Sequence, residues 1–219
     1  MSWHSSDRVF IIFNISNNVK IQGSDMMNRI DRKKNQILSS ECYRQCSSLE
    51  YKEIICLGLG PLNRSSSQWQ LALLLTLMEI DNFVNCNAFD PIFDLEDIDI
   101  LQKYNISNKE LYTSTKDIKT LFYMPHCEYK LMEDILESNL SNLENIVIFG
   151  TSYDSIRDKR FYNDLKSFAP LWTSFVNTIE DTRTPIQYKF IETPLVSEDW
   201  IDPHAFNDTC LFTFIKTSL

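Results

Sequence analysis

The sequence predicts an α/β fold, a Rossmann-like three-layer sandwich whose mostly parallel sheet ends in an antiparallel strand pair. From residue 53 onward, short apolar runs of strand length alternate with longer segments of helical period. This alternation is typical of parallel strands joined by crossover helices. No helix-length segment separates the last two strand-like runs, so these two strands should pair antiparallel. With 219 residues, 43% of them hydrophobic, the chain can bury one sizeable core.

We expect two parts, an N-terminal extension over residues 1–50 and the Rossmann-like domain over residues 51–219. The extension starts with an apolar stretch at 9–15, and its polar second half carries Ile30 and Ile37 within a pattern that predicts a helix. The domain should contain seven strands because seven apolar runs of strand length follow one another. They lie near residues 53–57, 85–89, 110–113, 119–124, 145–149, 186–192 and 209–215.

The first crossover helix is expected over residues 66–80. The sequence from Ser65 to Gln68 has the pattern of a capping box, in which a serine caps the helix start and a glutamine returns the hydrogen bond. The body of this segment is apolar on nearly all sides. Such a helix should be buried within the fold rather than lie on its surface.

Three more helices are expected along the domain. One covers residues 95–104, with Asp94 as its cap and Asp97 three residues later. Another should follow Cys127, and a fourth should occupy parts of residues 154–180. These helices fall between strand-like runs, as the crossovers of a parallel sheet do.

The charge balance argues against nucleic acid and membrane surfaces as partners. The chain has 21 Lys and Arg against 30 Asp and Glu, a formal charge of −9, which repels phosphate backbones and anionic lipids. No apolar run reaches the ~20 residues of a spanning helix, and none reads as a signal peptide. We therefore expect a cytoplasmic protein. The basic cluster at residues 29–34 is a solvated helix face or, alternatively, a nuclear-import patch.

The six cysteines indicate free thiols rather than a disulfide framework or a metal site. They lie far apart except for one i, i+4 pair, and none forms a C-x-x-C motif. His126 directly precedes Cys127, but adjacent residues of an extended chain point to opposite sides, so the two should not share a metal. A Cys–His nucleophilic pair is a less favoured alternative to a packed strand end.

The turn after the first strand is the first candidate for a binding site. Of the four glycines in the chain, Gly58 and Gly60 both follow the strand at 53–57. Glycines permit a tight turn and close approach of a ligand to the backbone, and the next helix N-terminus offers N–H donors to an anion. Asn63 stands where the dinucleotide fingerprint has its third glycine. A turn without any ligand is the alternative.

Further candidate residues follow the other strands. Asp90 comes after the second strand, where Rossmann-like sites hold a ribose hydroxyl by a carboxylate. His126 and Cys127 follow the fourth expected strand, and Gly150 closes the fifth. Ligands of open α/β sheets bind outside the carboxyl ends of the strands. These residues therefore predict one cofactor-binding crevice, while no catalytic residue is predicted.

A set of short motifs resembles the SRR-like proteins, a family named for "sensitivity to red light reduced". In chain order the motifs are CLGLG at 56–60, WQLA at 69–72, FDP at 89–91, FYMPHC at 122–127, LESN at 136–139, IFG at 148–150 and AFNDT at 205–209. The resemblance covers about residues 52 to 214. It adds Asn207 and Asp208 to the candidate site. Thr151 departs from the asparagine that the family tends to have after Gly150.

The resemblance implies a regulatory role without an established reaction. The family is associated with light and circadian-clock input in plants, and elsewhere with haem biosynthesis and cytoskeletal phenotypes, in cytoplasm and nucleus. Our leading hypothesis is a regulatory protein that binds a small nucleotide-like ligand in the crevice, with its protein partners unspecified. The alternative is an enzyme similar to S-adenosylmethionine-dependent methyltransferases, by analogy of fold. Haem is a less favoured ligand because few candidate axial ligands are present.

Overall fold

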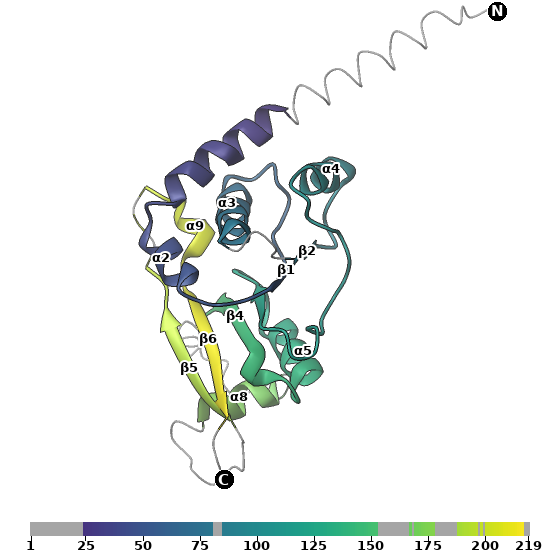
Figure 1. Cartoon of the computed structure of the whole chain (residues 1–219), viewed down its shortest axis with the longest axis vertical. Coiled ribbons are helices and arrows are strands. Elements are labelled where there is room, and N and C mark those ends of the chain that lie inside the picture. Colours follow the sequence, from purple (N-terminus) through teal and green to yellow (C-terminus); the bar gives the residue numbers. More distant parts are fainter. Residues whose placement is uncertain are drawn as a thin grey trace, which may run out of the picture.

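The structure, a computed structural model, describes residues 24–80, 85–152, 167, 169–177, 188–196, 198 and 200–216. Within these residues one mixed sheet has the strand order β2-β1-β3-β4-β6-β5 (Figure 1). The strands are β1 (Glu53–Leu57), β2 (Asn85–Phe89), β3 (Thr120–Tyr123), β4 (Ile146–Thr151), β5 (Tyr188–Pro194) and β6 (Thr209–Lys216). Strands β1 to β4 pair in parallel, and β6 pairs antiparallel with both β4 and β5. The expected fold class is confirmed.

Helices cover both faces of this sheet. They are α3 (Ser65–Glu79), α4 (Leu95–Lys103), α5 (Tyr129–Asn139), α8 (Pro170–Asn177) and α9 (Pro203–Phe206), with a 3₁₀ turn η1 (Leu143–Asn145). Successive residues of β1 show the three layers. Ile54 belongs to a core cluster with α3 and α9, whereas Ile55 belongs to a second cluster with α5 and α8. Most residues on both faces of β1, β3 and β4 are buried, which is why these strands are largely apolar.

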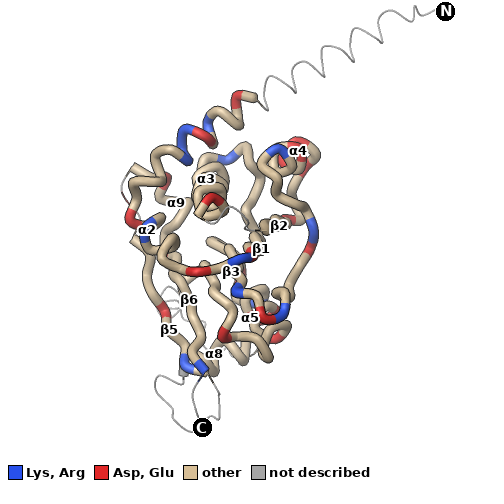
Figure 2. The backbone as a smooth tube through the Cα atoms, in the orientation of Figure 1, with Lys and Arg blue, Asp and Glu red and all other residues tan. Residues whose placement is uncertain are grey.

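The N-terminal segment that the structure describes packs onto the first of these clusters. Residues 24–37 are helical, as expected, and Ile30 and Ile37 are fully buried among the core residues. Acidic and basic residues alternate along this helix (Figure 2). Two of its lysines contact α3, since Lys33 lies 4.4 Å from the centre of the Trp69 ring and Lys34 pairs with Glu79. Part of the basic cluster is thus engaged with the domain.

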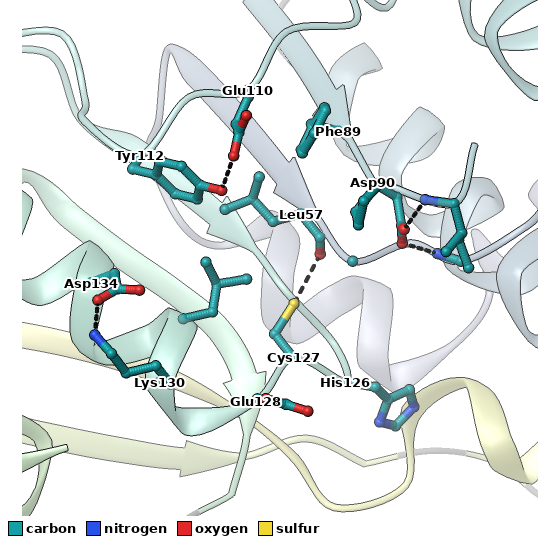
Figure 3. Close-up of a pocket in the computed structure, with 15 residues that line it drawn as sticks. Leu57, Phe89, Asp90, Glu110, Tyr112, His126, Cys127, Glu128, Lys130 and Asp134 are labelled. Atoms are coloured by element: carbon teal, nitrogen blue, oxygen red, sulfur yellow. Dashed lines mark hydrogen bonds and ion pairs between the residues drawn. The ribbon is translucent and has the colours of Figure 1, made fainter. Parts of the chain in front are cut away.

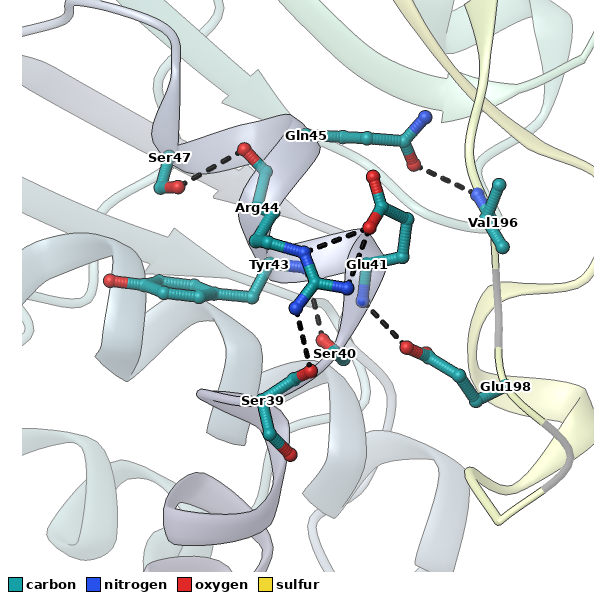
Figure 4. Close-up of polar contacts among 9 residues, drawn as sticks. All are labelled: Ser39, Ser40, Glu41, Tyr43, Arg44, Gln45, Ser47, Val196 and Glu198. Atoms are coloured by element: carbon teal, nitrogen blue, oxygen red, sulfur yellow. Dashed lines mark hydrogen bonds and ion pairs between the residues drawn. The ribbon is translucent and has the colours of Figure 1, made fainter.

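A second N-terminal helix, α2 (Glu41–Ser47), is tied to the segment that follows β5 (Figure 4). The Glu41 backbone N–H donates to the Glu198 carboxylate at 2.6 Å. The Gln45 side-chain amide donates to the Pro194 carbonyl and accepts from the Val196 N–H, at 3.2 and 2.9 Å. Segments about 150 residues apart in sequence are therefore held side by side.

The prediction of a strand at 110–113 is wrong. These residues form no strand, and their neighbour Ser107 makes a single parallel bridge to Asn87 of β2. The segment is held by the buried side chain of Asn139 instead, which donates to the Tyr112 carbonyl at 2.9 Å and accepts from the Ser114 N–H at 2.8 Å. The Asn139 side-chain amide thus holds this segment in place of a strand ladder. The sheet, expected to have seven strands, has six in the described residues.

The capping box expected at the start of α3 is also wrong. The N-cap residue is Arg64, whose side chain makes no capping hydrogen bond. Gln68 donates instead to the Leu62 carbonyl at 2.9 Å. By contrast, α4 begins with the expected cap, because Asp94 and Asp97 form a reciprocal capping box.

Several expectations lie outside the described residues. They are the apolar stretch at 9–15, the first two residues of the strand expected at 186–192, and most of the helix expected within 154–180. The described part of that last region contains α8, and β5 extends two residues beyond the expected strand. None of the described helices is long and apolar enough to span a bilayer.

Candidate functional site

A cavity of about 730 Å³ opens at the carboxyl edge of the parallel strands (Figure 3). Its walls are the turns that follow β1 and β2, the segment at 110–112, and the start of α5. We call this cavity the crevice. Strand β1 lies between β2 and β3, so the crevice occupies the place where the strand order reverses. Open α/β sheets bind their ligands at such a point.

Five of the eight residues predicted for the site line the crevice, namely Gly58, Gly60, Asp90, His126 and Cys127. They come from three separate strand ends, as the topology argument requires. The sequence alone therefore locates the edge of the sheet at which the crevice opens. The contacts of these residues give them structural roles in addition to the ligand contacts that the sequence predicts.

Both glycines are required by the protein's own geometry. Their φ angles are +69° at Gly58 and +75° at Gly60, a region that L side chains rarely adopt. A β-carbon on Gly58 would overlap the Cys127 sulfur, and one on Gly60 would lie 2.9 Å from the Ser67 hydroxyl oxygen. The turn therefore needs glycine whether or not a ligand is bound.

Asp90 holds the glycine turn in place. Its Oδ2 accepts a hydrogen bond from the Gly60 N–H at 2.8 Å, and its Oδ1 accepts from the Ile92 N–H at 3.0 Å. The residue is only 8% exposed but lines the crevice. A carboxylate has about four lone-pair positions, so it can still accept from a ligand hydroxyl after these two bonds.

A second aspartate holds the next part of the same turn. Asp97 Oδ1 accepts a hydrogen bond from the Leu62 N–H at 3.0 Å, and its Oδ2 accepts from the Asp94 N–H at 3.2 Å. Burial raises the pKa of Asp97, although both backbone hydrogen bonds oppose the rise. The sequence identifies Asp97 as part of a helix cap, and the structure adds its contact with the turn after β1.

His126 and Cys127 point in different directions (Figure 3). The Cys127 thiol donates to the Leu57 carbonyl at 3.2 Å. Burial, with the charges of Asp90 and Glu128 adding to it, raises the pKa of Cys127 to about 12. This thiol is therefore protonated at neutral pH and is not an activated nucleophile.

The His126 ring joins the crevice to α9. Its Nε2 lies 2.8 Å from the His204 carbonyl oxygen and 3.1 Å from that of Ala205. Carbonyl oxygens can only accept, so Nε2 carries the hydrogen. The imidazole does not contact the thiol of Cys127 in this arrangement, which leaves the alternative of a Cys–His pair without support.

The other three predicted residues do not line the crevice. Gly150 is buried in β4, where an added β-carbon would lie 3.0 Å from Met132 Cε. Asn207 and Asp208 are exposed after α9, and the Asp208 carbonyl accepts a hydrogen bond from the Ser152 N–H at 2.6 Å. Their sequence position after a short helix places them beside the sheet edge but outside the cavity.

The crevice also has walls that the sequence reasoning missed. Their apolar members include Ile92 and Leu131, and Tyr112 donates its hydroxyl hydrogen to Glu110. Charged residues complete the lining, namely Glu110, Glu128, Lys130 and Asp134. The i, i+4 spacing of Lys130 and Asp134 on the helix expected after Cys127 could have indicated the ion pair that they form. Glu110 and Tyr112 were missed because the sequence predicted a strand at 110–113.

A smaller hollow of about 400 Å³ lies elsewhere, between the helix at 24–37 and the start of α4. It is lined by Asp25, Met26, Arg29, Asn63 and Glu96. None of the predicted site residues borders it. Among the described residues no group of three or more His, Cys, Asp and Glu side chains is placed to hold a metal ion, and all six cysteines are buried free thiols.

The fold and the crevice define a Rossmann-like α/β protein with a cavity at the switch point of its sheet. The sequence comparison is more specific. The SRR1 domain family matches residues 26–213, and the chain belongs to this family. The resemblance seen in the short motifs is thereby confirmed, and the match begins within the helix at 24–37.

Curated relatives come from animals and plants. An SRR1-like protein of Drosophila melanogaster is 29% identical over 174 residues, which cover 77% of this chain and 57% of the relative. An SRR1-like protein of Mus musculus is 29% identical, covering 52% of this chain and 49% of the relative. Protein SENSITIVITY TO RED LIGHT REDUCED 1 of Arabidopsis thaliana is 25% identical, with 49% and 42% coverage. The chain spans about half the length of these relatives.

Solved structures with a similar arrangement include two plantazolicin methyltransferases. BpumL in complex with SAH is 15% identical, with 94% of this chain and 90% of that chain covered and a TM-score of 0.38. BamL in complex with a triazolic desmethylPZN analog and SAH is 10% identical at the same coverage, with a TM-score of 0.41. These likenesses concern the fold alone.

Proposed function

We propose that this SRR1-family protein is a regulatory protein whose crevice binds a small nucleotide-like molecule. The crevice itself is the observation that carries the proposal. Its volume of about 730 Å³ falls in the range of small-molecule sites, roughly 300 to 1,000 Å³. It combines apolar walls with a few fixed polar groups, which is the composition of such sites.

The two glycines of the turn after β1 do not by themselves indicate a bound ligand. Gly58 and Gly60 are explained by their own φ angles and by their neighbours Cys127 and Ser67. Support comes instead from the position of the cavity at the switch point, and from Asp90, which keeps accepting capacity toward the cavity. The proposal therefore depends on the walls of the cavity more than on a motif.

The regulatory part of the proposal rests on family membership. A plant relative is named for reduced sensitivity to red light. We extend this to a role in light or circadian-clock input, or in the control of haem biosynthesis, within cytoplasm and nucleus. On this proposal, binding of the ligand in the crevice changes how the protein interacts with its partners.

A thermal-shift screen tests binding. A ligand at one hundred times its dissociation constant stabilises the folded state by about 2.7 kcal/mol, which for this chain length raises the melting midpoint by roughly 5 to 11 °C. S-adenosylmethionine, S-adenosylhomocysteine, adenosine, NAD, ATP and haemin form the panel. We expect one of the nucleoside compounds to raise the midpoint.

A matched pair of tryptophan variants locates the bound molecule. Ile92 lines the crevice and is 56% exposed, so Ile92→Trp should fill the cavity without disturbing the core. Leu95, which is 85% exposed and lies outside the crevice, gives the control Leu95→Trp. The shift should be lost in the first variant and kept in the second. No shift by any compound at millimolar concentration, or a shift that persists in Ile92→Trp, contradicts the proposal.

A further inference from the structure

Three backbone N–H groups in the turn after β1, those of Gly58, Gly60 and Leu62, are already hydrogen-bonded within the protein. Phosphate-binding loops work by pointing successive amides at the anion. Here the Gly58 N–H donates to the Phe89 carbonyl at 3.2 Å, and the Gly60 N–H donates to Asp90. The Leu62 N–H donates to Asp97, and proline at position 61 has no N–H.

Two carboxylates thus accept hydrogen bonds from backbone N–H groups that could otherwise bind a phosphate. Asp90 and Asp97 approach the turn from the end of β2 and from α4, and they are 8% and 4% exposed. A phosphate would have to displace them, and it would meet their negative charge at short range. At the Gly60 and Leu62 amides the turn is therefore unfavourable to a phosphate group.

The charged lining of the crevice is negative on balance. Asp90, Glu110, Glu128 and Asp134 contribute four carboxylates. Among the lining residues that the structure describes, Lys130 is the one lysine or arginine, and it is paired with Asp134. The other three carboxylates have no cationic partner among the described residues of the lining. A cavity with apolar walls and a net negative lining concentrates positively charged ligands.

The apolar part of the lining suits a flat ring system. The side chains of Phe89 and Tyr112 face the crevice beside Leu57 (Figure 3). Burial of a planar base against aromatic and aliphatic side chains supplies affinity that needs no charge. The positive charge of a ligand would then lie toward Glu110 and Glu128.

We propose that the crevice selects a nucleoside-sized ligand that carries a positive charge and has no phosphate group. This inference rests on the proposed function, because it names the ligand class of the same cavity. A sulfonium or ammonium nucleoside meets the requirement. Nucleotides with one or more phosphates do not.

Calorimetric titration of the full chain with paired probes tests the inference. S-adenosylmethionine and S-adenosylhomocysteine differ by one methyl group and one positive charge, and adenosine and 5′-AMP differ by one phosphate. We expect S-adenosylmethionine to bind about tenfold more tightly than S-adenosylhomocysteine, and adenosine about tenfold more tightly than 5′-AMP. The first ratio should fall as salt is raised from 50 to 500 mM, because salt screens charge and not shape.

Two variants of exposed glutamates provide the charge control. Glu128 lines the crevice, whereas Glu137 on α5 does not. Glu128→Gln should reduce the preference for S-adenosylmethionine severalfold, and Glu137→Gln should leave it unchanged. If 5′-AMP or ATP binds more tightly than adenosine, the inference is overturned while the crevice stands as a binding site. If no probe binds, both this inference and the proposed function fail.

Discussion

The Asp90 carboxylate and the Gly60 backbone are joined by a hydrogen bond of 2.8 Å between Oδ2 and the amide nitrogen. The two residues are 30 positions apart in sequence and lie at the ends of adjacent parallel strands. This bond fixes the turn that forms one wall of the crevice. An acid in the position expected for ligand contact therefore has a structural role as well.

Replacing Asp90 by alanine should destabilise the fold by about 3 kcal/mol. The change removes hydrogen bonds to a charged acceptor and leaves the Gly60 and Ile92 N–H groups without it. Asp90→Asn keeps one acceptor oxygen and should lose about half as much. Denaturant titration at pH 7 measures both values. A loss below 1 kcal/mol in Asp90→Ala would show that the turn does not depend on this carboxylate.

Gly58 and Cys127 should be energetically coupled. Gly58→Ala should cost about 3 kcal/mol, of which roughly 1 to 2 belongs to the positive φ and the rest to overlap with the Cys127 sulfur. In the Cys127→Ala background only the φ part should persist. A double-mutant cycle measures the difference. Additive effects would mean that the sulfur does not fill the space beside Gly58.

Thiol reactivity should be low in the native protein. The pKa of Cys127 near 12 leaves about one molecule in 10⁴ as thiolate at pH 8, and the other five cysteines are also buried. Because this folded-state pKa lies above that of an unfolded thiol, stability is full below about pH 9 and falls as pH rises toward 12.

An aromatic disulfide reagent tests this prediction by comparing native and denatured protein. Six thiols should react rapidly in guanidinium chloride, and none should do so in native buffer at pH 8. The native rate should rise steeply with pH. Rapid native labelling that mass spectrometry assigns to Cys127 would refute the low reactivity and revive a nucleophilic role.

His126 and Asn207 should tolerate alanine with a loss of about 1 kcal/mol or less. Both side chains are exposed. His126 loses only its hydrogen bonding to the carbonyls of α9, and a typical bond of this kind contributes about 1 kcal/mol. Chemical denaturation of the two variants gives the answer. A loss several times larger at either position would make that residue structural.

The alternation of strands and helices could be predicted because it depends on local pattern. Glu53–Leu57 and Asn85–Phe89 match the expected strands in both bounds, and the Asp94 cap of α4 was found from spacing alone. These features need only periodicity and a nearby side chain. The carboxyl edge of the sheet followed from topology, and with it five of the residues that line the crevice.

What failed depends on contacts distant in sequence. Nothing local distinguishes 110–113 from a strand, since Asn139 binds Tyr112 across 27 residues. The bonds of Asp90 to Gly60 and of Asp97 to Leu62 likewise span 30 and 35 residues. The expected sheet topology indicates that residues such as Gly60 and Asp90 lie near one another, because the carboxyl ends of parallel strands meet at one edge. It does not show whether a carboxylate faces a ligand or the protein backbone.

Hydrogen–deuterium exchange with and without saturating S-adenosylmethionine tests the central claim most directly, because it reports where a ligand binds. We predict slower exchange in residues 57–62, 89–92 and 127–134, the turns and helix start that line the crevice. Exchange in residues 25–29, beside the smaller hollow, should not change. Saturable binding that leaves the crevice segments unprotected, or that protects 25–29 alone, would contradict the assignment of the crevice as the ligand site.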